Sequence, residues 1–597
     1  MRLDRIDRAS YNQDEGEPAD HAWSANVGRT LAAGERHRND EASADSAPRL
    51  RTRSEAALTG GRVLKRPTTT PFAATSQSAE TLGGSRESVA PDGTVYAIPS
   101  ADEARSSFES IARAAREHRS RGGRVVVVQG LGFVGSAAAA VIADATETTG
   151  EHPYFVIGVD LATKASYWKV AKVAAGIPPV ASTDPELDRL TRSGVHEVGN
   201  LHATTCEDAY ALADVIVVDV HLDAHAGDGE DGGIRVDLDP FVAAIRTIGR
   251  AMQPDALVII ETTVPVGTCE RVVLPILQEE RLARGVDTPV LLAHAYERVM
   301  PGPRYVDSIR AYPRTFAGVD ERSAEAASQF LASVVRGTDG GGLRRLASPA
   351  SSELAKLLEN SYRATNIALV HEWTLLAEEI GVNLFEVVDS IRVRKGTHDN
   401  MRYPGFGVGG YCLTKDSLLA QWGATNLLGS ETVLAMTLDA LGTNAAMPLH
   451  TARLVKEALG GSIDGAVIAI GGVSYLPDVA DTRNSPTETL VAELIAGGAT
   501  VRVHDPIVRA WIERPDIPIV SDLRATLADA DGIVLAVPHA AYRGLTAAGL
   551  VGEINRPAFL VDAQNVISDE TARELHAARW RVLGVGKGHW RAEGLHR

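Results

Sequence analysis

The chain has no long hydrophobic run. Its longest apolar runs, Val125 to Val128 and Ala256 to Ile260 among them, fall far short of the ~20 residues that a transmembrane helix needs. The first residues, Met1 to Arg5, lack the apolar segment of a secretory signal peptide. We therefore expect no membrane partner and a cytoplasmic location.

The chain also lacks an excess of positive charge. It has 60 Lys and Arg against 77 Asp and Glu, which gives a formal net charge of −17. A nucleic-acid binder would need a basic face, so this class of protein is excluded. Any anionic substrate must be held by local basic groups and helix N-termini, because the overall field repels it.

Cysteine is scarce. The three cysteines, Cys206, Cys269 and Cys412, lie far apart and form no CxxC pair, so we expect neither a metal site nor a disulfide framework. A sparse, odd set fits a reducing compartment. We interpret Cys206 as structural, and Cys269, near an expected helix start, as at most mildly activated.

The composition divides the chain into four parts. Residues 1–95 are rich in small and charged residues, have few aromatics and show no lasting apolar period, so we predict a mostly disordered extension. It is either an inert tail or a regulatory or docking segment. The spacing of Phe108, Ile111 and Ala115 then predicts a helix over 101–118.

From residue 122 to 305, short buried strands alternate with helices, and the same pattern returns over 463–590. The first set of expected strands is 125–129, 154–159, 215–220, 257–261 and 290–293, and the second is 466–470, 501–504, 533–537 and 559–562. Residues 345–458 read as helices over 351–380, 383–392 and 415–458. Strand–helix alternation indicates a parallel sheet covered on both faces. The predicted fold is α/β, with two Rossmann-like parallel-sheet domains joined by a central helical domain.

A glycine motif marks a candidate cofactor site. Gly130, Gly132 and Gly135 form GxGxxG around Leu131, Phe133 and Val134, directly after the first strand and before a helix. Such a turn brings a pyrophosphate to the helix N-terminus. Asp160 ends the next strand, where a carboxylate can bind a ribose 2′-hydroxyl and repel a 2′-phosphate, which favours NAD over NADP. The alternative is a turn that only packs the helix on the strand.

A cysteine with chemical neighbours follows the glycine-rich run 403–410. Cys412 comes shortly before Lys415 and Asp416. A thiol there can attack an aldehyde, and a carboxylate within one helical turn can handle water. On the expected helix from residue 351, Glu353, Lys356 and Asn360 share one face, and a lysine amid apolar residues needs a partner or a purpose. A structural cysteine and a solvated helix face are the alternatives.

The segment from Tyr403 to Asp416 resembles the active-site loop of the nucleotide-sugar 6-dehydrogenases, the UDP-glucose and UDP-N-acetylhexosamine dehydrogenases. Three further segments resemble that family, in its order: 262–268 (Thr-Thr-Val-Pro-Val-Gly-Thr), 297–302 (Glu-Arg-Val-Met-Pro-Gly) and 478–486 (Asp-Val-Ala-Asp-Thr-Arg-Asn-Ser-Pro). The resemblance covers about 122–590.

The resemblance assigns roles to these residues. Cys412 is the nucleophile, and Asp416 accepts a proton or orients water. Lys356 and Asn360 steady a developing alkoxide. Thr263 is expected to contact water, the substrate and the cofactor, and Glu297 to assist thioester hydrolysis and contact the substrate. Arg298, Gly409 and Arg483 are expected to bind the substrate. Arg483 holds either the domain interface or a phosphate.

The implied reaction oxidises a UDP-hexose, with two NAD and water, to a UDP-hexuronate through a thiohemiacetal and a thioester, for polysaccharide or glycan precursor synthesis. The sugar is an N-acetylhexosamine (ManNAc or GlcNAc) or glucose: the Glu-Arg-Val form at 297–299 favours the former, and Tyr411 before Cys412 favours the latter. In the family that the chain resembles, the long helix from Ser351 forms the dimer, so the resemblance also implies a homodimer.

Departures from the family's pattern leave its substrate preference open: Leu476 replaces a lysine, Thr414 a proline, His221-Leu222 a Thr-Pro pair and His371 an asparagine. Two other functions remain as alternatives. A single-step hydroxy-acid dehydrogenase would have no use for Cys412 or for residues 463–590. A non-catalytic nucleotide-sugar sensor would have no use for the thiol and the general bases.

Overall fold

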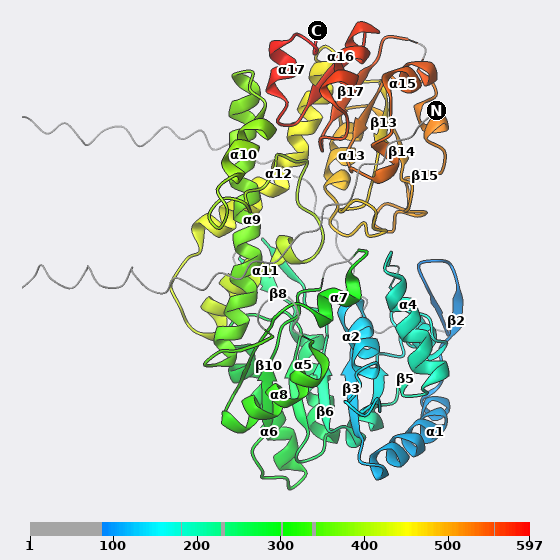
Figure 1. Cartoon of the computed structure of the whole chain (residues 1–597), viewed down its shortest axis with the longest axis vertical. Coiled ribbons are helices and arrows are strands. Elements are labelled where there is room, and N and C mark those ends of the chain that lie inside the picture. Colours follow the sequence, from blue (N-terminus) through cyan, green and yellow to red (C-terminus); the bar gives the residue numbers. More distant parts are fainter. Residues whose placement is uncertain (1–85, 181, 228–232, 300–301, 337–341, 555) are drawn as a thin grey trace, which may run out of the picture. The chain divides into compact units, whose positions relative to one another are not determined.

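A computed structural model of the chain describes residues 86–180, 182–227, 233–299, 302–336, 342–554 and 556–597 (Figure 1). The predicted disordered extension over 1–95 therefore lies mostly outside the described residues. Its last part is ordered, and there the prediction is wrong: β1 (Glu87–Val89) and β2 (Val95–Ala97) pair as an antiparallel hairpin. Two of its residues, Ser88 and Ala90, are buried by tertiary contacts, which a composition argument cannot see.

The first sheet has eight strands, in the order β12-β11-β10-β9-β6-β3-β4-β5, and only the β10–β11 pair in it is antiparallel. The strands are β3 (Arg124–Gln129), β4 (Tyr154–Val159), β5 (Leu201–Thr204), β6 (Val215–Val218), β9 (Leu257–Ile260), β10 (Leu291–His294), β11 (Arg314–Gly318) and β12 (Leu343–Arg345). The sheet therefore continues past residue 305, where the sequence suggested its end. The chain leaves β3 in one direction for β4 and in the other for β6, so the switch point where such sheets bind ligands lies between β3 and β6.

Helices cover both faces of this sheet because its central strands are apolar on both sides. Along β3, Val126 and Val128 pack into one core, and Val125 and Val127 pack into the other. The first core is closed by α2 (Phe133–Ala143), α3 (Tyr167–Ala174), α4 (Pro185–Arg192), α7 (Tyr305–Arg310) and α8 (Glu321–Val334). The second is closed by α1 (Ala101–Ser120), α5 (Asp239–Ala251) and α6 (Leu274–Ala283). A two-stranded sheet of β7 (Ala224–Ala226) and β8 (Ile234–Val236) lies apart from the first sheet.

The central segment is helical. It consists of α9 (Pro349–Glu379), α10 (Leu384–Arg392), α11 (Cys412–Trp422) and α12 (Ala435–Ala458). The helix predicted over 415–458 is interrupted, because the chain leaves the helix after 427 and turns at Gly429, whose φ is 64°. Gln421 closes this connection: its side chain donates to the Thr432 carbonyl and accepts from the Leu434 N–H.

The second large sheet has six strands, all parallel, in the order β15-β14-β13-β16-β17-β18. They are β13 (Val467–Gly471), β14 (Thr500–His504), β15 (Ile519–Val520), β16 (Gly532–Leu535), β17 (Phe559–Asp562) and β18 (Arg581–Gly584). One face packs on α12 and α13 (Pro486–Ala496), the other on α14 (Leu523–Leu527), α15 (Ala547–Glu553), α16 (Asp569–Ala577) and α17 (Gly588–Ala592). The predicted α/β, helical, α/β order is confirmed. None of the helices among the described residues is long and apolar enough to span a bilayer.

Candidate active site

The glycine turn after β3 leaves room where a dinucleotide phosphate would approach. Gly130 has a φ of 97°, and a Cβ on it would lie 2.4 Å from the Asp219 carbonyl oxygen. A Cβ on Gly135 would lie 1.9 Å from the Gly130 oxygen, whereas one on Gly132 would meet no atom within 4 Å. The first and third glycines thus allow close packing, and the second opens the N-terminus of α2, which begins with Phe133 and Val134. This turn fits the pyrophosphate of NAD.

Asp160 lies beside this turn, directly after β4. Its carboxylate accepts hydrogen bonds from the Leu131 N–H at 2.9 Å and from the Leu161 N–H at 2.7 Å. Lys169 Nζ on α3 is 3.6 Å from Asp160 Oδ2. The side chain is therefore fixed at the strand end where a Rossmann carboxylate meets the adenosine ribose.

Cys412 is the first residue of α11, and its side chain is exposed. Desolvation by the surrounding protein atoms is the largest cause that raises the pKa of the thiol to about 11, and the charge of Asp416 is the next. Lys356 and Lys415 act in the opposite direction. The thiol is thus protonated at neutral pH in the free protein. A group that accepts its proton is needed before it can attack a carbonyl carbon.

Lys356 projects from α9 and is buried. Its Nζ donates to the Glu297 carbonyl oxygen at 2.8 Å and lies 3.4 Å from Glu297 Oε1. Burial opposes its charge, but Glu297, Cys412 and Asp416 outweigh burial and raise its pKa. The site therefore holds a permanent cation within the electrostatic reach of the thiol.

Asn360 lies one turn further along α9. Its Nδ2 donates to Asp416 Oδ2 at 2.6 Å, and Lys415 Nζ lies 3.4 Å from Asp416 Oδ1. Asp416 is almost fully buried, one helical turn after Cys412. The structure thus brings together five predicted residues from the loop after β10, from α9 and from α11: Glu297, Lys356, Asn360, Cys412 and Asp416.

The loop after β9 is anchored by a residue that received no role in the sequence analysis. Glu353 on α9 accepts hydrogen bonds from the Gly267 N–H at 2.6 Å and from the Cys269 N–H at 2.8 Å. Burial raises its pKa to about 6, even though these backbone donors favour the charged form. In the sequence, the one indication of a role for Glu353 was its spacing of three residues from Lys356, which places both on one face of the helix. Thr263, half-buried in this loop, remains a predicted water and substrate contact.

Two predicted substrate contacts have protein partners in the structure. Arg298 donates to Glu359 on α9, to the Tyr296 hydroxyl and to the Pro313 carbonyl. Arg483 is paired with Asp481, and its Cζ lies 4.5 Å from the centre of the Tyr411 ring and 5.6 Å from that of Phe133. Arg483 thereby links the second α/β domain to the start of α2 and to the residue before Cys412.

The glycine-rich run 403–410 allows close packing. A Cβ on Gly409 would lie 2.6 Å from Tyr475 Cβ, and one on Gly410 would lie 2.7 Å from the Tyr475 ring. A Cβ on Gly407 would lie 2.7 Å from Pro486. The second α/β domain is therefore in contact with the backbone that leads into Cys412.

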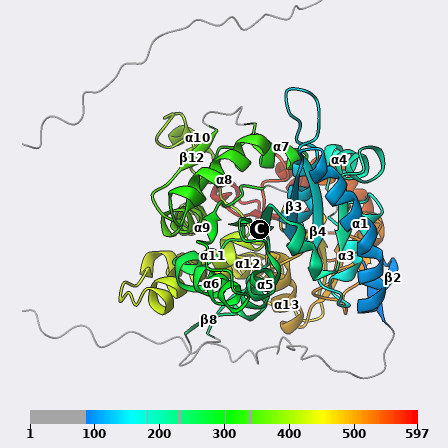
Figure 2. The same ribbon diagram turned by 90° about the horizontal axis from the view of Figure 1, so that it is seen from below.

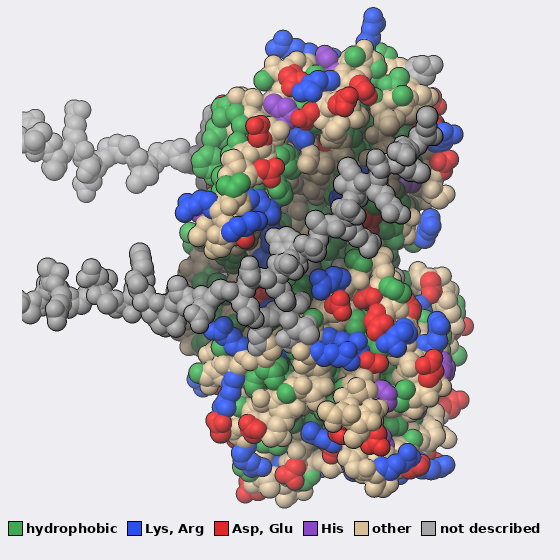
Figure 3. Space-filling view, viewed as in Figure 1, with side chains coloured by type: hydrophobic (Ala, Val, Ile, Leu, Met, Phe, Trp, Pro, Cys, Tyr) green, Lys and Arg blue, Asp and Glu red, His purple; other side chains and the backbone are tan. Residues whose placement is uncertain are grey.

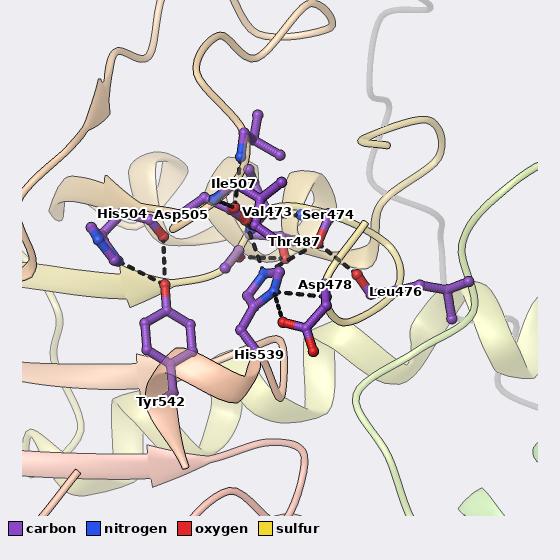
Figure 4. Close-up of polar contacts among 12 residues, drawn as sticks. Val473, Ser474, Leu476, Asp478, Thr487, His504, Asp505, Ile507, His539 and Tyr542 are labelled. Atoms are coloured by element: carbon purple, nitrogen blue, oxygen red, sulfur yellow. Dashed lines mark hydrogen bonds and ion pairs between the residues drawn. The ribbon is translucent and has the colours of Figure 1, made fainter. Parts of the chain in front are cut away.

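The loop that carries Tyr475 is held by a buried histidine (Figure 4). His539 Nδ1 accepts the Asp478 N–H at 2.9 Å, so the ring proton is on Nε2, 3.1 Å from Asp505 Oδ2. Asp505 also accepts the Val473 N–H at 2.9 Å. Asp505 follows β14 as Asp160 follows β4, and both carboxylates bind the backbone after a glycine turn. Leu476, the departure noted above, is exposed on this loop.

The sequence did not point to a second acid beside the cofactor turn, the half-buried Asp219. Asp219 follows β6, and among the described residues its Oδ2 has no hydrogen-bond partner. Burial, then the neighbouring Glu261 and Glu297, raises its pKa well above the ordinary value. Arg314 is ion-paired with Glu261, and its positive charge offsets this rise in the pKa of Asp219 only in part. In the sequence, the feature that could have indicated this residue was its position at the end of a strand, like that of Asp160.

Comparisons with known proteins agree along the chain. Three family profiles match, all of the UDP-glucose/GDP-mannose dehydrogenase family: its NAD binding domain at residues 124–334, its central domain at 350–440 and its UDP binding domain at 469–569. The UDP-N-acetyl-D-mannosamine dehydrogenase of Pyrococcus horikoshii is 31% identical over 468 residues, which cover 78% of this chain and 99% of that protein.

Solved structures give the same picture. The NDP-N-acetyl-D-galactosaminuronic acid dehydrogenase of Methanosarcina mazei superposes with a TM-score of 0.66 and is 29% identical in sequence. The match covers 80% of this chain and 98% of that protein's chain. A UDP-glucose dehydrogenase of Pyrobaculum islandicum has a TM-score of 0.64 and 25% identity, over 78% and 98%.

Proposed function

The chain belongs to the UDP-glucose/GDP-mannose dehydrogenase family, and on that premise we propose that Cys412 carries its substrate through a four-electron oxidation at C6. The protein is an NAD-dependent dehydrogenase of a UDP-sugar. The observation that supports the proposal is the meeting of Cys412, Asp416, Asn360, Lys356 and Glu297 at one site. NAD binds the first α/β domain through Gly130, Gly132, Gly135 and Asp160, and UDP binds the second.

In the first oxidation, the C6 hydroxyl loses a proton and a hydride and becomes an aldehyde. NAD, when bound, accepts the hydride in this step and a second NAD does so in the next. The Nζ of Lys356 and the amide of Asn360 stabilise the oxyanion that develops at C6. This task suits them because both are fixed before the reaction, Lys356 by Glu297 and Asn360 by Asp416.

In the second oxidation, Cys412 Sγ adds to the aldehyde carbon and its proton leaves. Asp416, one turn away, accepts this proton. The thiohemiacetal oxyanion formed in this way loses a hydride and becomes a thioester. The exposed position of Cys412 permits contact with a sugar, and its high pKa explains why an adjacent base is required.

Water then cleaves the thioester, which releases the carboxylate and returns the thiol. Glu297 activates the water and Thr263 orients it. The sum is one UDP-sugar, two NAD and one water giving one UDP-uronate, two NADH and three protons. The product is a precursor for a surface polysaccharide or glycan, made in the cytoplasm.

The substrate we propose is a UDP-N-acetylhexosamine. Two of the reported relatives are named for N-acetylated sugars, one for N-acetyl-D-mannosamine and one for N-acetyl-D-galactosaminuronic acid. The Glu-Arg-Val segment at 297–299 favours the same class. UDP-glucose is the second candidate, because Tyr411 precedes Cys412 and because a UDP-glucose dehydrogenase shares the fold.

A homodimer through α9 is also proposed. One side of this helix exposes large apolar side chains, part of which are visible in green along the edge that carries α9 in Figure 3. They are Leu354, Leu358, Tyr362, Leu369, Trp373, Leu376 and Ile380. An apolar stripe of this length on a soluble enzyme is expected to be covered by a partner, and a second copy of α9 offers a matching surface.

The test measures the number of NADH molecules formed for each UDP-sugar consumed. The purified protein is mixed with NAD and a panel of UDP-sugars, and NADH formed is counted per sugar consumed. Two NADH per sugar, with no acid formed by Cys412→Ala, is the expected result. Full acid formation by Cys412→Ala would overturn the thioester route. One NADH per sugar would indicate an enzyme that stops at the carbonyl, and binding without turnover would indicate a sensor.

A further inference from the structure

The β1–β2 hairpin lies before residue 124, where the family match begins. It packs on α3, the helix that follows Asp160, and Figure 2 shows β2 next to α3. Helix α1 connects the hairpin to β3 and packs on the sheet through Phe108, Ala112 and Ala115. The hairpin is thus packed on α3 and joined through α1 to the first α/β domain.

Ser88 in this hairpin takes the place of a helix cap. The N-cap residue of α3, Ser166, makes no side-chain capping bond. Instead, the Trp168 N–H donates to Ser88 Oγ at 3.1 Å, and Ser88 Oγ donates to the Lys164 carbonyl at 2.7 Å. The Ser88 hydroxyl therefore bridges an N–H and a carbonyl four residues apart, the pair that a regular helix would join directly. Ser88 is completely buried.

A second contact ties the turn of the hairpin to the same helix. Lys172 Nζ on α3 donates to Asp92 Oδ2 at 2.5 Å. One turn earlier on α3, Lys169 Nζ lies 3.6 Å from Asp160 Oδ2. The start of α3 and two of its lysines are thus fixed between the hairpin on one side and the ribose carboxylate on the other.

We propose that this hairpin, residues 86–98, braces the adenosine side of the NAD site, with Ser88 and Asp92 as positioning residues. By fixing the first turn of α3, Ser88 holds the loop 161–166 and places Lys169 beside Asp160. The carboxylate is then already oriented when the ribose arrives, so less ordering is needed on binding. The inference rests on the proposed ribose contact of Asp160.

A contribution to folding alone is the other explanation of these contacts. It differs in what it predicts for the two ligand sites. A weakened fold would affect NAD and UDP binding alike, whereas a brace acts on the cofactor site because UDP binds the other α/β domain. The position of Ser88 over the one end of α3 that lacks its own cap favours the brace.

The experiment measures the dissociation constants of NADH and UDP for the full chain and its variants. Ser88→Ala leaves the Trp168 N–H and the Lys164 carbonyl without their partner and is expected to raise the NADH constant about three- to tenfold. The UDP constant and kcat at saturating NAD stay unchanged. Ser88→Thr, which keeps the hydroxyl, restores NADH binding. Asp92→Asn, at the exposed turn, shifts NADH binding in the same direction by less.

Two controls separate the possible failures. Ser110→Ala removes an exposed hydroxyl on α1 that bonds the Ser107 carbonyl of the same helix, and it should change neither constant. If Asp160→Ala binds NADH as well as the wild type, the ribose assignment is wrong and the brace has no target. If Asp160→Ala weakens NADH binding but Ser88→Ala and Asp92→Asn do not, or if Ser88→Ala weakens UDP equally, the brace is refuted.

Discussion

Asn360 Nδ2 donates to Asp416 Oδ2 at 2.6 Å, which joins α9 to α11 one turn after Cys412. The bond uses one lone pair of a carboxylate that is almost fully buried, and Lys415 lies beside the other oxygen. Asp416 is therefore held in a fixed orientation next to a protonated thiol. This pairing makes the reactivity of Cys412 dependent on Asp416.

Removing the Asp416 charge should lower the thiol pKa. In the wild type, modification of Cys412 by iodoacetamide should accelerate as pH rises towards about 11, because only the thiolate reacts. Asp416→Asn should shift this profile to lower pH, since the charge that opposes the thiolate is gone. Peptide mass spectrometry of the alkylated protein reports each cysteine separately, and the buried Cys206 and Cys269 serve as internal controls. An unchanged profile would contradict the electrostatic coupling.

Replacing Lys356 should slow the first oxidation much more than it weakens cofactor binding. Lys356→Met keeps an unbranched side chain only one atom shorter but removes the cation that faces the developing oxyanion. Loss of one preorganised group of this kind costs about 100-fold or more in kcat. Steady-state kinetics, with an NADH titration of the same sample, measures both effects. Lys415→Met provides a comparison, because the Nζ of Lys415 lies beside the other Asp416 oxygen. A kcat within a few-fold of wild type would remove Lys356 from the mechanism.

Asp219→Asn should stabilise the protein, and more so at higher pH. The folded protein keeps a proton on Asp219 after the unfolded chain has lost it near the ordinary pKa of 3.8. Folding stability therefore falls as pH rises above that value, by about 1.4 kcal/mol per pH unit for one proton, until the raised folded pKa is reached. The asparagine of the Asp219→Asn variant does not titrate, so it adds no such dependence of folding stability on pH. Thermal unfolding at pH 5 and at pH 8 should show a Tm gain that is larger at pH 8; a gain confined to pH 5 would contradict the assignment.

A charge on the apolar side of α9 should dissociate the proposed dimer. Leu358 is 63% exposed and Trp373 is 55% exposed. Leu358→Glu and Trp373→Glu should convert a dimer to a monomer, because burying a carboxylate without a partner is costly. Size-exclusion chromatography with light scattering measures the mass. Ile512→Glu, at a 66% exposed apolar residue of the second α/β domain, should leave it unchanged.

The sequence predicted the sheets well, because their buried strands are short runs of Val and Ile with glycine turns at their ends. It did not predict the break after α11, since residues 415–458 keep a helical apolar pattern and the break depends on side-chain bonds of Gln421. Nor did it predict the edge strands β12, β5, β15 and β18, or β11 beside β12.

The candidate site was predicted where residues follow one another in motifs. Glu353 received no role and Asp219 was overlooked, because their importance comes from partners far along the chain: the Gly267 and Cys269 N–H groups for Glu353, and Glu261 for Asp219. The hairpin's contact with α3 was invisible for the same reason, because Ser88 and Trp168 are 80 residues apart.

The contact of Gly409 and Gly410 with Tyr475 has a consequence for how this enzyme evolves and can be engineered. The backbone that leads into the nucleophile is shaped by a ring from the nucleotide-binding domain, and Gly407 fits Pro486 in the same way. The second α/β domain is therefore not an exchangeable module. A chimera that takes this domain from a relative, in order to change the base or the sugar, must carry the matching glycine run with it, so the two segments are expected to be inherited as a pair.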